Sequence, residues 1–390
     1  MILSAMVCWA GLLSQIPPGV AQPLGEDSLS PAATGTGESR MLSDTSAFST
    51  TTWEDFVTIE GEVDTYYSWF LSAVPRTPSS YRLLDKSNGT FSLAYAELSL
   101  EMAPQPVGFR FDLGFGEVAE ATASAPANVF KYVKQGYASF NLPFQRNITV
   151  DVGKFVTTAG AAAEVIDSRH NWNYSHSLLF TYSNPFTHTG IRVNAALTRA
   201  LNLQASLVNG WDVVADNNAS KTFGLSLQYA LPHNFTAVLT VYAGPEGNSS
   251  KDWRTLVDLV VAKTLSERFS VNLSADYATE NAGHWYGVAA RGHWTVNDLL
   301  RLSVRGEYMG DPHLLRLALP GSPGLGATDL VEFTGTAAVP VGRNGEFRFE
   351  IRRDEALASL SGSRAVFSTG TFSGPSTGET TLQFAAMAWF

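Results

Sequence analysis

The sequence predicts an all-β protein, a closed antiparallel transmembrane β-barrel of about sixteen strands. Three observations predict it. Segments of about ten residues alternate apolar and polar side chains, the connections between them are alternately short and long, and the chain ends on an aromatic residue within such a segment. A membrane-spanning sheet has to close on itself because the bilayer interior offers no partner to an unpaired backbone group.

The alternation is clearest where polar and apolar residues strictly interleave. In "VGFRFDLGFG" one face carries valine, phenylalanine and leucine, and the other carries Arg110 and Asp112. A tilted strand of about ten residues rises roughly 23 Å, about the height of the apolar band of an outer-membrane barrel. The predicted strands are 57–70, 91–102, 107–118, 131–142, 148–158, 187–198, 202–213, 222–231, 234–244, 254–264, 269–279, 284–295, 299–309, 330–340, 345–357 and 380–390.

The connections between these strands differ in length in a regular way. Those after even-numbered strands are short, such as "APQP", "RAL" and "PH", whereas those after odd-numbered strands include residues 71–90, 159–186, 310–329 and 358–379. Short periplasmic turns and long extracellular loops are typical of outer-membrane barrels. A soluble β-sandwich also has alternating strands but requires no such asymmetry. Because the strand number is even, we expect both ends of the barrel on the periplasmic side.

The two ends of the chain predict targeting to a membrane. Residues 1–21 are apolar and end in small residues, which predicts a cleaved signal peptide. Residues 22–52 are rich in Ser, Thr, Gly and Pro and predict a flexible periplasmic lead-in, so that the barrel would occupy residues 53–390. Phe390 follows apolar residues at alternate positions and resembles the C-terminal signal that the barrel-assembly machinery recognises. The only cysteine, Cys8, falls within the predicted signal peptide, so the mature chain would have no disulfide.

The polar faces of the predicted strands would line the lumen. Acidic residues outnumber basic ones on this face, which predicts a weak preference for cations. Because charged side chains in a water-filled channel keep their hydration, we expect them to be exposed and to need no partner. The predicted pore-lining residues are Glu60, Glu62, Asp64, Glu97, Arg110, Asp112, Arg192, Asp276, Arg301, Arg305, Glu307, Arg348, Glu350 and Arg352.

The longest connection, residues 159–186, is a candidate constriction loop. It begins with a run of alanines that permits a helix, and it holds Glu164, Asp167, Arg169 and His170 close together. A barrel of about sixteen strands is wide enough to leave an aqueous channel unless something fills it. We expect this connection to fold inward with its charges facing the permeant solute. The alternative is an extracellular lid or a loop packed over the rim.

The stretch from about residue 91 to residue 195 resembles a known family. The motifs "FSLAYAELSLE", "PVGFRFDLGFG", "KYVKQGYASFNLP", "VDVGKFVTTAGAAAEVID", "NWNYSHSLLF" and "PFTHTGIR" are similar to those of the OmpL-like outer-membrane β-barrel porins of Gram-negative bacteria. The resemblance implies a porin-type barrel in the bacterial outer membrane. It brings no established catalytic residue and no defined substrate. We therefore expect a channel for passive diffusion of small hydrophilic solutes or ions, in contact with outer-membrane lipid.

Other function classes have weaker support in the sequence. The string "GPSTG" around Ser376 lies in a Gly/Ser/Thr-rich loop and lacks the strand–turn–helix context of a catalytic serine. The spacing of His170, His176 and His188 is a weak metal signal, so we expect neither a metal nor another cofactor. The formal net charge of −10 argues against a nucleic-acid partner.

Two other functions and the oligomeric state stay open at this point. A hydrolase with its site at the barrel rim would need a set of catalytic side chains that converge at one height, and a receptor or adhesion barrel would have a closed lumen. A passive channel needs no catalytic residue, so we expect no enzyme activity. A homotrimer would be familiar for a sixteen-stranded porin, although the sequence shows no self-complementary surface.

Overall fold

A computed structural model describes most of the chain from Phe56 to Phe390. The described residues are 56–71, 81–123, 129–142, 148–231, 234–247, 249, 251–319, 325–359, 367 and 376–390. The predicted signal peptide, residues 1–21, and the predicted lead-in, residues 22–52, lie outside them. Both therefore stay predictions.

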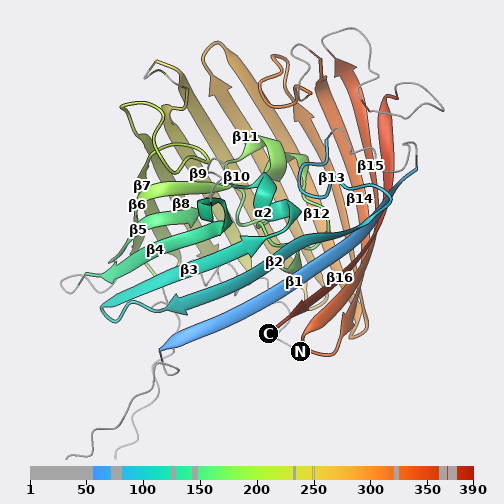
Figure 1. The fold of residues 1–390 in the computed structure, drawn as a ribbon, viewed down its shortest axis with the longest axis horizontal. Helices are drawn as coiled ribbons and strands as arrows, with labels where there is room; N and C mark the ends of the chain where they lie inside the picture. The colour runs from blue at the N-terminus through green and yellow to red at the C-terminus, as the bar shows by residue number, and fades with distance from the viewer. Residues whose placement is uncertain are drawn as a thin grey trace, which may run out of the picture.

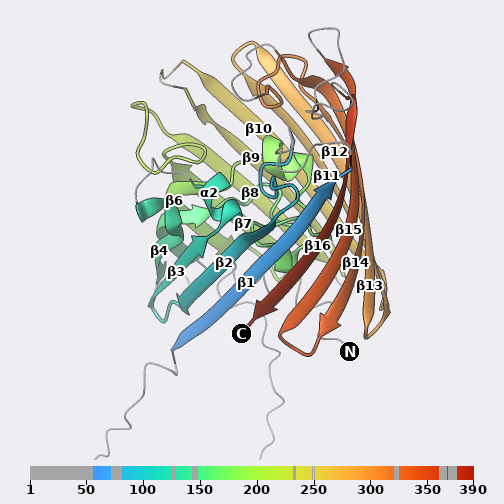
Figure 2. The same ribbon diagram turned by 45° about the vertical axis from the view of Figure 1, so that its right-hand side comes forward.

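Sixteen antiparallel strands form a closed barrel in which each strand pairs with its neighbours in the chain and β1 pairs with β16 (Figures 1 and 2). Closure leaves no strand edge unpaired in the membrane. The strands are β1 (Val57–Phe70), β2 (Phe91–Met102), β3 (Val107–Phe115), β4 (Val133–Asn141), β5 (Ile148–Val156), β6 (Thr187–Ala196), β7 (Leu201–Val208), β8 (Thr222–Leu231), β9 (Phe235–Pro245), β10 (Trp253–Ser266), β11 (Phe269–Glu280), β12 (Gly283–Asn297), β13 (Leu300–Gly310), β14 (Ala327–Val341), β15 (Gly345–Ser359) and β16 (Gly378–Trp389).

Every predicted strand has a counterpart in the barrel, and the differences lie at strand ends. Strand β3 stops at Phe115 rather than at residue 118, because Gly116 has a φ of 102° and redirects the chain into the short helix α2 (Glu117–Ala121). A side chain would be strained at that φ, which glycine adopts freely. A 3₁₀ turn, η2 (Val129–Tyr132), precedes β4, so that strand begins two residues later than residue 131.

Strand β11 shows the predicted division into an outer apolar face and an inner polar face. On β11, Leu273 and Tyr277 are 56% and 51% exposed on the outer face, whereas Asp276 between them is 4% exposed and points inward. The outer apolar face suits contact with lipid, and the inner face collects the polar side chains. None of the helices among the described residues has the length and hydropathy that a membrane span requires.

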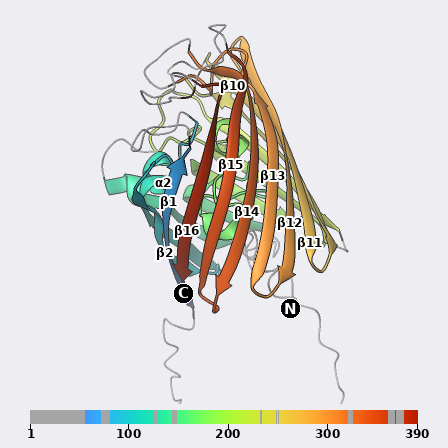
Figure 3. The ribbon, with the colours of Figure 1, turned by 90° about the vertical axis from the view of Figure 1, so that its right-hand side faces the viewer.

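The barrel wall is of uneven height. Strands β12, β14 and β15 have 15 residues each, whereas β3, β4 and β5 have 9 each. Strands β11–β16, which we call the tall wall, stand side by side in Figure 3. The short strands β3–β5 form the lower wall opposite them in Figure 1. The start of β1 and the end of β16 lie at one end of the barrel, as expected from the even strand number.

The connection between β5 and β6 lies inside the barrel. We call residues 157–186 the inner segment. It contains a 3₁₀ turn, η3 (Ser168–His170), and a π-helical turn, η4 (Leu179–Ser183), which contacts β11 and β12. Two apolar clusters form around it, one with Leu178 and Trp285 and the other with Tyr174 and Phe180. Apolar side chains of the inner segment therefore pack together with side chains of the barrel wall inside the lumen.

Candidate functional site: the barrel lumen

The inner segment is held against the tall wall by a buried ion-pair cluster. Arg291 on β12 and Arg305 on β13 are direct cross-strand partners, and Glu164 of the inner segment lies against both. Its carboxylate is 3.0 Å from Arg291 Nη2 and 2.9 Å from Arg305 Nη1. Two like charges directly opposite in a sheet repel each other, so the carboxylate between them stabilises the pair. The Ser177 hydroxyl also donates to Glu164.

Carboxylates of the tall wall bind the backbone of the inner segment. Glu307 on β13 accepts a hydrogen bond of 2.8 Å from the N–H of Leu178, next to the start of η4. Glu350 on β15 accepts one of 2.7 Å from the N–H of Tyr174. An irregular segment inside a barrel has few backbone partners of its own, and buried backbone groups must be paired. These wall carboxylates supply the missing acceptors.

Guanidinium groups of the same wall pair the backbone carbonyls. Arg305 donates to Ser175 O at 2.6 Å, Arg352 to His176 O at 2.6 Å and Arg348 to Ser168 O at 2.8 Å.

The burial of many lumen charges differs from the expectation from the sequence that they are exposed to water. The side chains of the predicted pore-lining set that are buried instead are Asp64, Asp112, Arg192, Asp276, Arg305, Glu307, Arg348, Glu350 and Arg352. The reason is that the inner segment fills much of the lumen and uses many of these charges as partners.

Several other predicted lumen residues also have side-chain partners. Arg192 pairs with Asp151 at 2.9 Å, Arg301 with Glu346 at 3.2 Å and Arg110 with Asp112 at 3.0 Å, while Asp276 accepts from Asn184 at 3.1 Å and Asp64 from the Tyr174 hydroxyl at 3.1 Å. Asp64 lies on β1, which pairs with β16. The inner segment is therefore tied to β1 as well as to β12, β13 and β15.

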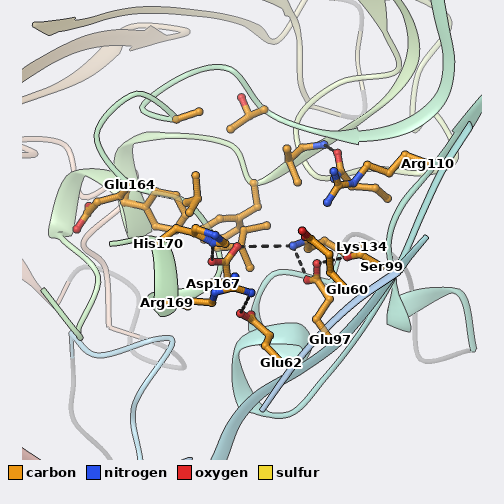
Figure 4. A pocket seen from close by; sticks show the side chains of 18 of the residues that line it. Glu60, Glu62, Glu97, Ser99, Arg110, Lys134, Glu164, Asp167, Arg169 and His170 are labelled. Atoms are coloured by element: carbon orange, nitrogen blue, oxygen red, sulfur yellow. Dashed lines mark hydrogen bonds and ion pairs between the residues drawn. The ribbon is translucent and has the colours of Figure 1, made fainter. Parts of the chain in front are cut away.

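A cavity of about 270 Å³ remains between the inner segment and β1–β5. The predicted residues that line it are Glu60, Glu62, Glu97 and Arg110 from the strands and Glu164, Asp167, Arg169 and His170 from the inner segment (Figure 4). All four residues predicted for the constriction thus lie at one cavity. Most of the other predicted lumen residues lie away from it.

Lys134 also lines this cavity, and the alternation did not predict it. The register of β3 and β4 shifts between Asp112 and Leu113, so that Lys134 is an extra residue in the ladder. Such a bulge lets two successive side chains reach the same face. Lys134 accordingly points into the lumen beside Gln135 and pairs with Glu97. A two-residue period alone assigns Lys134 to the outer face.

Several charged side chains at the cavity lie close to one another. Lys134 Nζ is 3.9 Å from Asp167 Oδ2, and Asp167 also contacts the ring of His170. Burial raises the pKa of Asp167, but His170, Lys134 and Arg169 outweigh this effect and hold the pKa below its ordinary value. Asp167 is therefore ionised. Arg169 Nη1 is 3.9 Å from Glu62 Oε2, and its guanidinium lies over the Trp389 ring.

The histidines and Ser376 each have local partners. His176 contacts Val165 O at 2.9 Å, and His188 contacts Gly210 O at 3.0 Å. Burial lowers the pKa of His176, so its ring is neutral at neutral pH. The Ser376 hydroxyl donates to Gly378 O at 2.8 Å. Within the described part of the chain, no three His, Asp or Glu side chains gather as metal ligands.

The end of the chain closes the barrel. The N–H of Phe390 donates to Gly61 O at 3.0 Å, and the N–H of Gly61 donates to Phe390 O at 3.3 Å. The Phe390 side chain is 70% exposed. Its backbone thus extends the β1–β16 ladder by one residue pair, and its role as an assembly signal stays a prediction.

Comparison with known families decides what this barrel is. The family described as "Putative beta-barrel porin-2, OmpL-like" matches residues 56–390. The chain belongs to the OmpL-like β-barrel porins. This porin is therefore an outer-membrane channel protein of bacterial type, as the resemblance in residues 91–195 implied. Among curated proteins, none matches the porin in sequence.

Solved porins share the fold of this porin at low sequence identity. The outer-membrane channel DcaP of Acinetobacter baumannii has a TM-score of 0.57 at 10% identity, over 86% of this chain and 97% of that chain. OmpF of Salmonella typhi, in a complex with daunomycin, has a TM-score of 0.56 at 11% identity over 86% and 97%. The anion-selective porin of Comamonas acidovorans has a TM-score of 0.54 at 12% identity over 86% and 99%. At these identities the likeness concerns the fold alone.

Proposed function

We propose that the porin is a passive diffusion channel for small hydrophilic solutes or ions, with a weak preference for cations. The observation that carries the proposal is the position of the inner segment. It lies against the tall wall and leaves a charged cavity between itself and β1–β5. In this proposal the inner segment is the constriction, and solutes pass it on the side of β1–β5. No catalytic step is part of the proposal.

The cation preference rests on which cavity charges are already compensated. Glu164 is compensated by arginines of the tall wall, and Arg110 by Glu101 and Asp112. Glu60 on β1 is exposed and has no ion-pair partner among the described residues. Uncompensated carboxylates at a constriction attract cations and repel anions. The anion selectivity in the name of the Comamonas porin belongs to that protein, whose identity to this chain is 12%.

The oligomer that we propose is a homotrimer. OmpT of Vibrio cholerae has been solved in a trimer form, and that structure has a TM-score of 0.54 to this chain at 10% identity, over 86% of this chain and 99% of that chain. Cross-linking of the protein in native membranes tests the proposal. A ladder that ends at three subunits supports it, and a monomer band alone contradicts it.

The channel function is tested by single-channel recording. Residues 22–390 are refolded, their folded state is checked by heat-modifiable electrophoretic mobility, and they are inserted into a planar bilayer with a salt gradient. We expect discrete current steps and a reversal potential of cation-selective sign. A folded protein that inserts and never conducts would contradict the proposal and favour a receptor or adhesion barrel with a closed lumen.

A further inference from the structure

The cavity between the inner segment and β1–β5 has two sides of different chemistry. Glu60 and Glu62 on β1 and Glu97 on β2 lie together on one side, near Lys134 (Figure 4). The lining from the inner segment includes Ile166, Phe180 and Phe186, which belong to one apolar cluster. A cavity that combines apolar walls with a few placed polar groups is the usual form of a small-molecule site.

The carboxylates on β1 can accept a further hydrogen bond or ion pair. Glu62 Oε1 is buried and has no hydrogen-bond partner among the described residues, and its other oxygen is 3.9 Å from Arg169. Glu62 lies directly opposite Glu97 in the β1–β2 ladder. Like charges in that position repel, and a buried acceptor without a donor costs free energy. A bound cation would remove both costs.

Lys134 and Arg169 do not neutralise all of the carboxylates at the cavity. Lys134 lies between Glu97 and Asp167 and so neutralises part of their charge. Arg169 lies over the Trp389 ring and reaches Glu62 only at 3.9 Å. The carboxylates around Lys134 and Arg169 therefore outnumber these two cations, and the excess lies at β1.

We propose that this cavity binds a small organic cation that has an apolar body. Its ammonium group lies at Glu62 and Glu60, and its body lies toward Ile166, Phe180 and Phe186. The volume of about 270 Å³ suits a molecule of the size of an arylalkylamine. The inference deepens the proposed function, on which it rests, because it gives the solute class that the constriction selects. Inorganic cations pass the same site without the apolar contact.

Calorimetric titration of the refolded porin in detergent tests the inference. The probe is 2-phenylethylammonium, compared with 3-phenylpropionate, which reverses the charge, and with ethylammonium, which lacks the ring. We expect saturable binding of 2-phenylethylammonium, at least about tenfold tighter than either comparison compound. Equal affinity for the anion, or no saturable binding, would overturn the inference.

Variants then locate the site. Glu62→Gln keeps the size of the side chain and should weaken binding of 2-phenylethylammonium by about tenfold. Glu60→Gln provides a second test if Glu62→Gln does not fold. The matched control is Glu267→Gln, which removes the same charge from an exposed turn between β10 and β11 and should leave affinity unchanged. A loss as large in Glu267→Gln as in Glu62→Gln would overturn the assignment.

Bilayer recordings separate this inference from the proposed function. We expect 2-phenylethylammonium to reduce the single-channel current with the same dissociation constant as in calorimetry. A channel that conducts but binds the probe no better than the anion contradicts the inference alone. A protein that binds the probe and inserts, but never conducts, contradicts the channel function and leaves the binding site supported.

Discussion

At the scale of single residues, Glu164 decides where the inner segment lies. Arg291 and Arg305 face each other across β12 and β13, and Glu164 is the carboxylate of the inner segment that contacts both. Burial raises the pKa of Glu164, but Arg291 and Arg305 outweigh it and lower the pKa to about 2. The residue is thus a buried anion held between two cations. Removing one partner of such a cluster leaves an uncompensated buried charge.

Replacement of Glu164 should therefore destabilise the porin. We expect Glu164→Gln to lower the free energy of unfolding by about 3–5 kcal/mol, because Arg291 loses its ion-pair partner in the lumen. The measurement is the temperature at which the folded band disappears in heat-modifiable electrophoresis. The control is Glu120→Gln on α2, where the ion pair with Lys131 is exposed and contributes little. An equal shift in both variants would contradict the role of Glu164.

The same cluster predicts a pH dependence. A carboxylate whose pKa is lower in the folded state contributes stability above its ordinary pKa of 4.5, and this stability is lost as the pH falls toward the folded value of about 2. We expect the difference in unfolding temperature between the wild type and Glu164→Gln to be constant from pH 7 to about pH 5 and to shrink from there toward pH 2. A difference that is unchanged at low pH would show that the effect is steric and does not depend on charge.

At the scale of elements, the strands follow from the sequence and the inner segment does not. A period of two residues fixes which face of β11 meets lipid, because Leu273 and Tyr277 alternate with polar residues. The inner segment has no such period, and its turns η3 and η4 form because wall residues such as Glu307 bind its backbone. These contacts join residues far apart in the chain. Its inward fold and its four polar constriction residues could be expected from its length and composition, but its partners could not.

Shortening the inner segment should widen the channel. Deletion of residues 161–171 removes Glu164 and six other residues that line the cavity, so we expect a larger single-channel conductance. The measurement is the conductance of the refolded variant in a planar bilayer. Glu164→Gln is the control, since it removes the ion pairs of Glu164 with Arg291 and Arg305 and keeps the chain length. Unchanged conductance in the deletion, or an equal rise in the control, would contradict the constriction role.

At the scale of the whole molecule, the inner segment braces the barrel from within. Tyr174 bonds to Asp64 on β1, and Gly160 donates to Asp258 on β10 at 3.0 Å. The segment thus connects strands on opposite sides of the closed sheet, and it leaves the cavity at β1–β5 beside it. If solutes pass through this cavity, selectivity depends on its few uncompensated charges. The formal net charge of −10 on the chain would then have little influence.

Reversing one charge at the cavity distinguishes these two origins of selectivity. Glu60→Lys places a cation on the exposed inner position of β1, and we expect the ratio of cation to anion permeability to fall by about twofold or more at roughly 0.1 M salt. The reversal potential in a salt gradient measures it. Asp298→Lys makes the same change in net charge on the exposed turn between β12 and β13, outside the cavity, and should leave the ratio unchanged. An equal fall in both variants would mean that the net charge of the chain sets the preference. If the cavity charges set it, salt screens the charge on the turn within about 10 Å, and Asp298→Lys has no effect at the constriction.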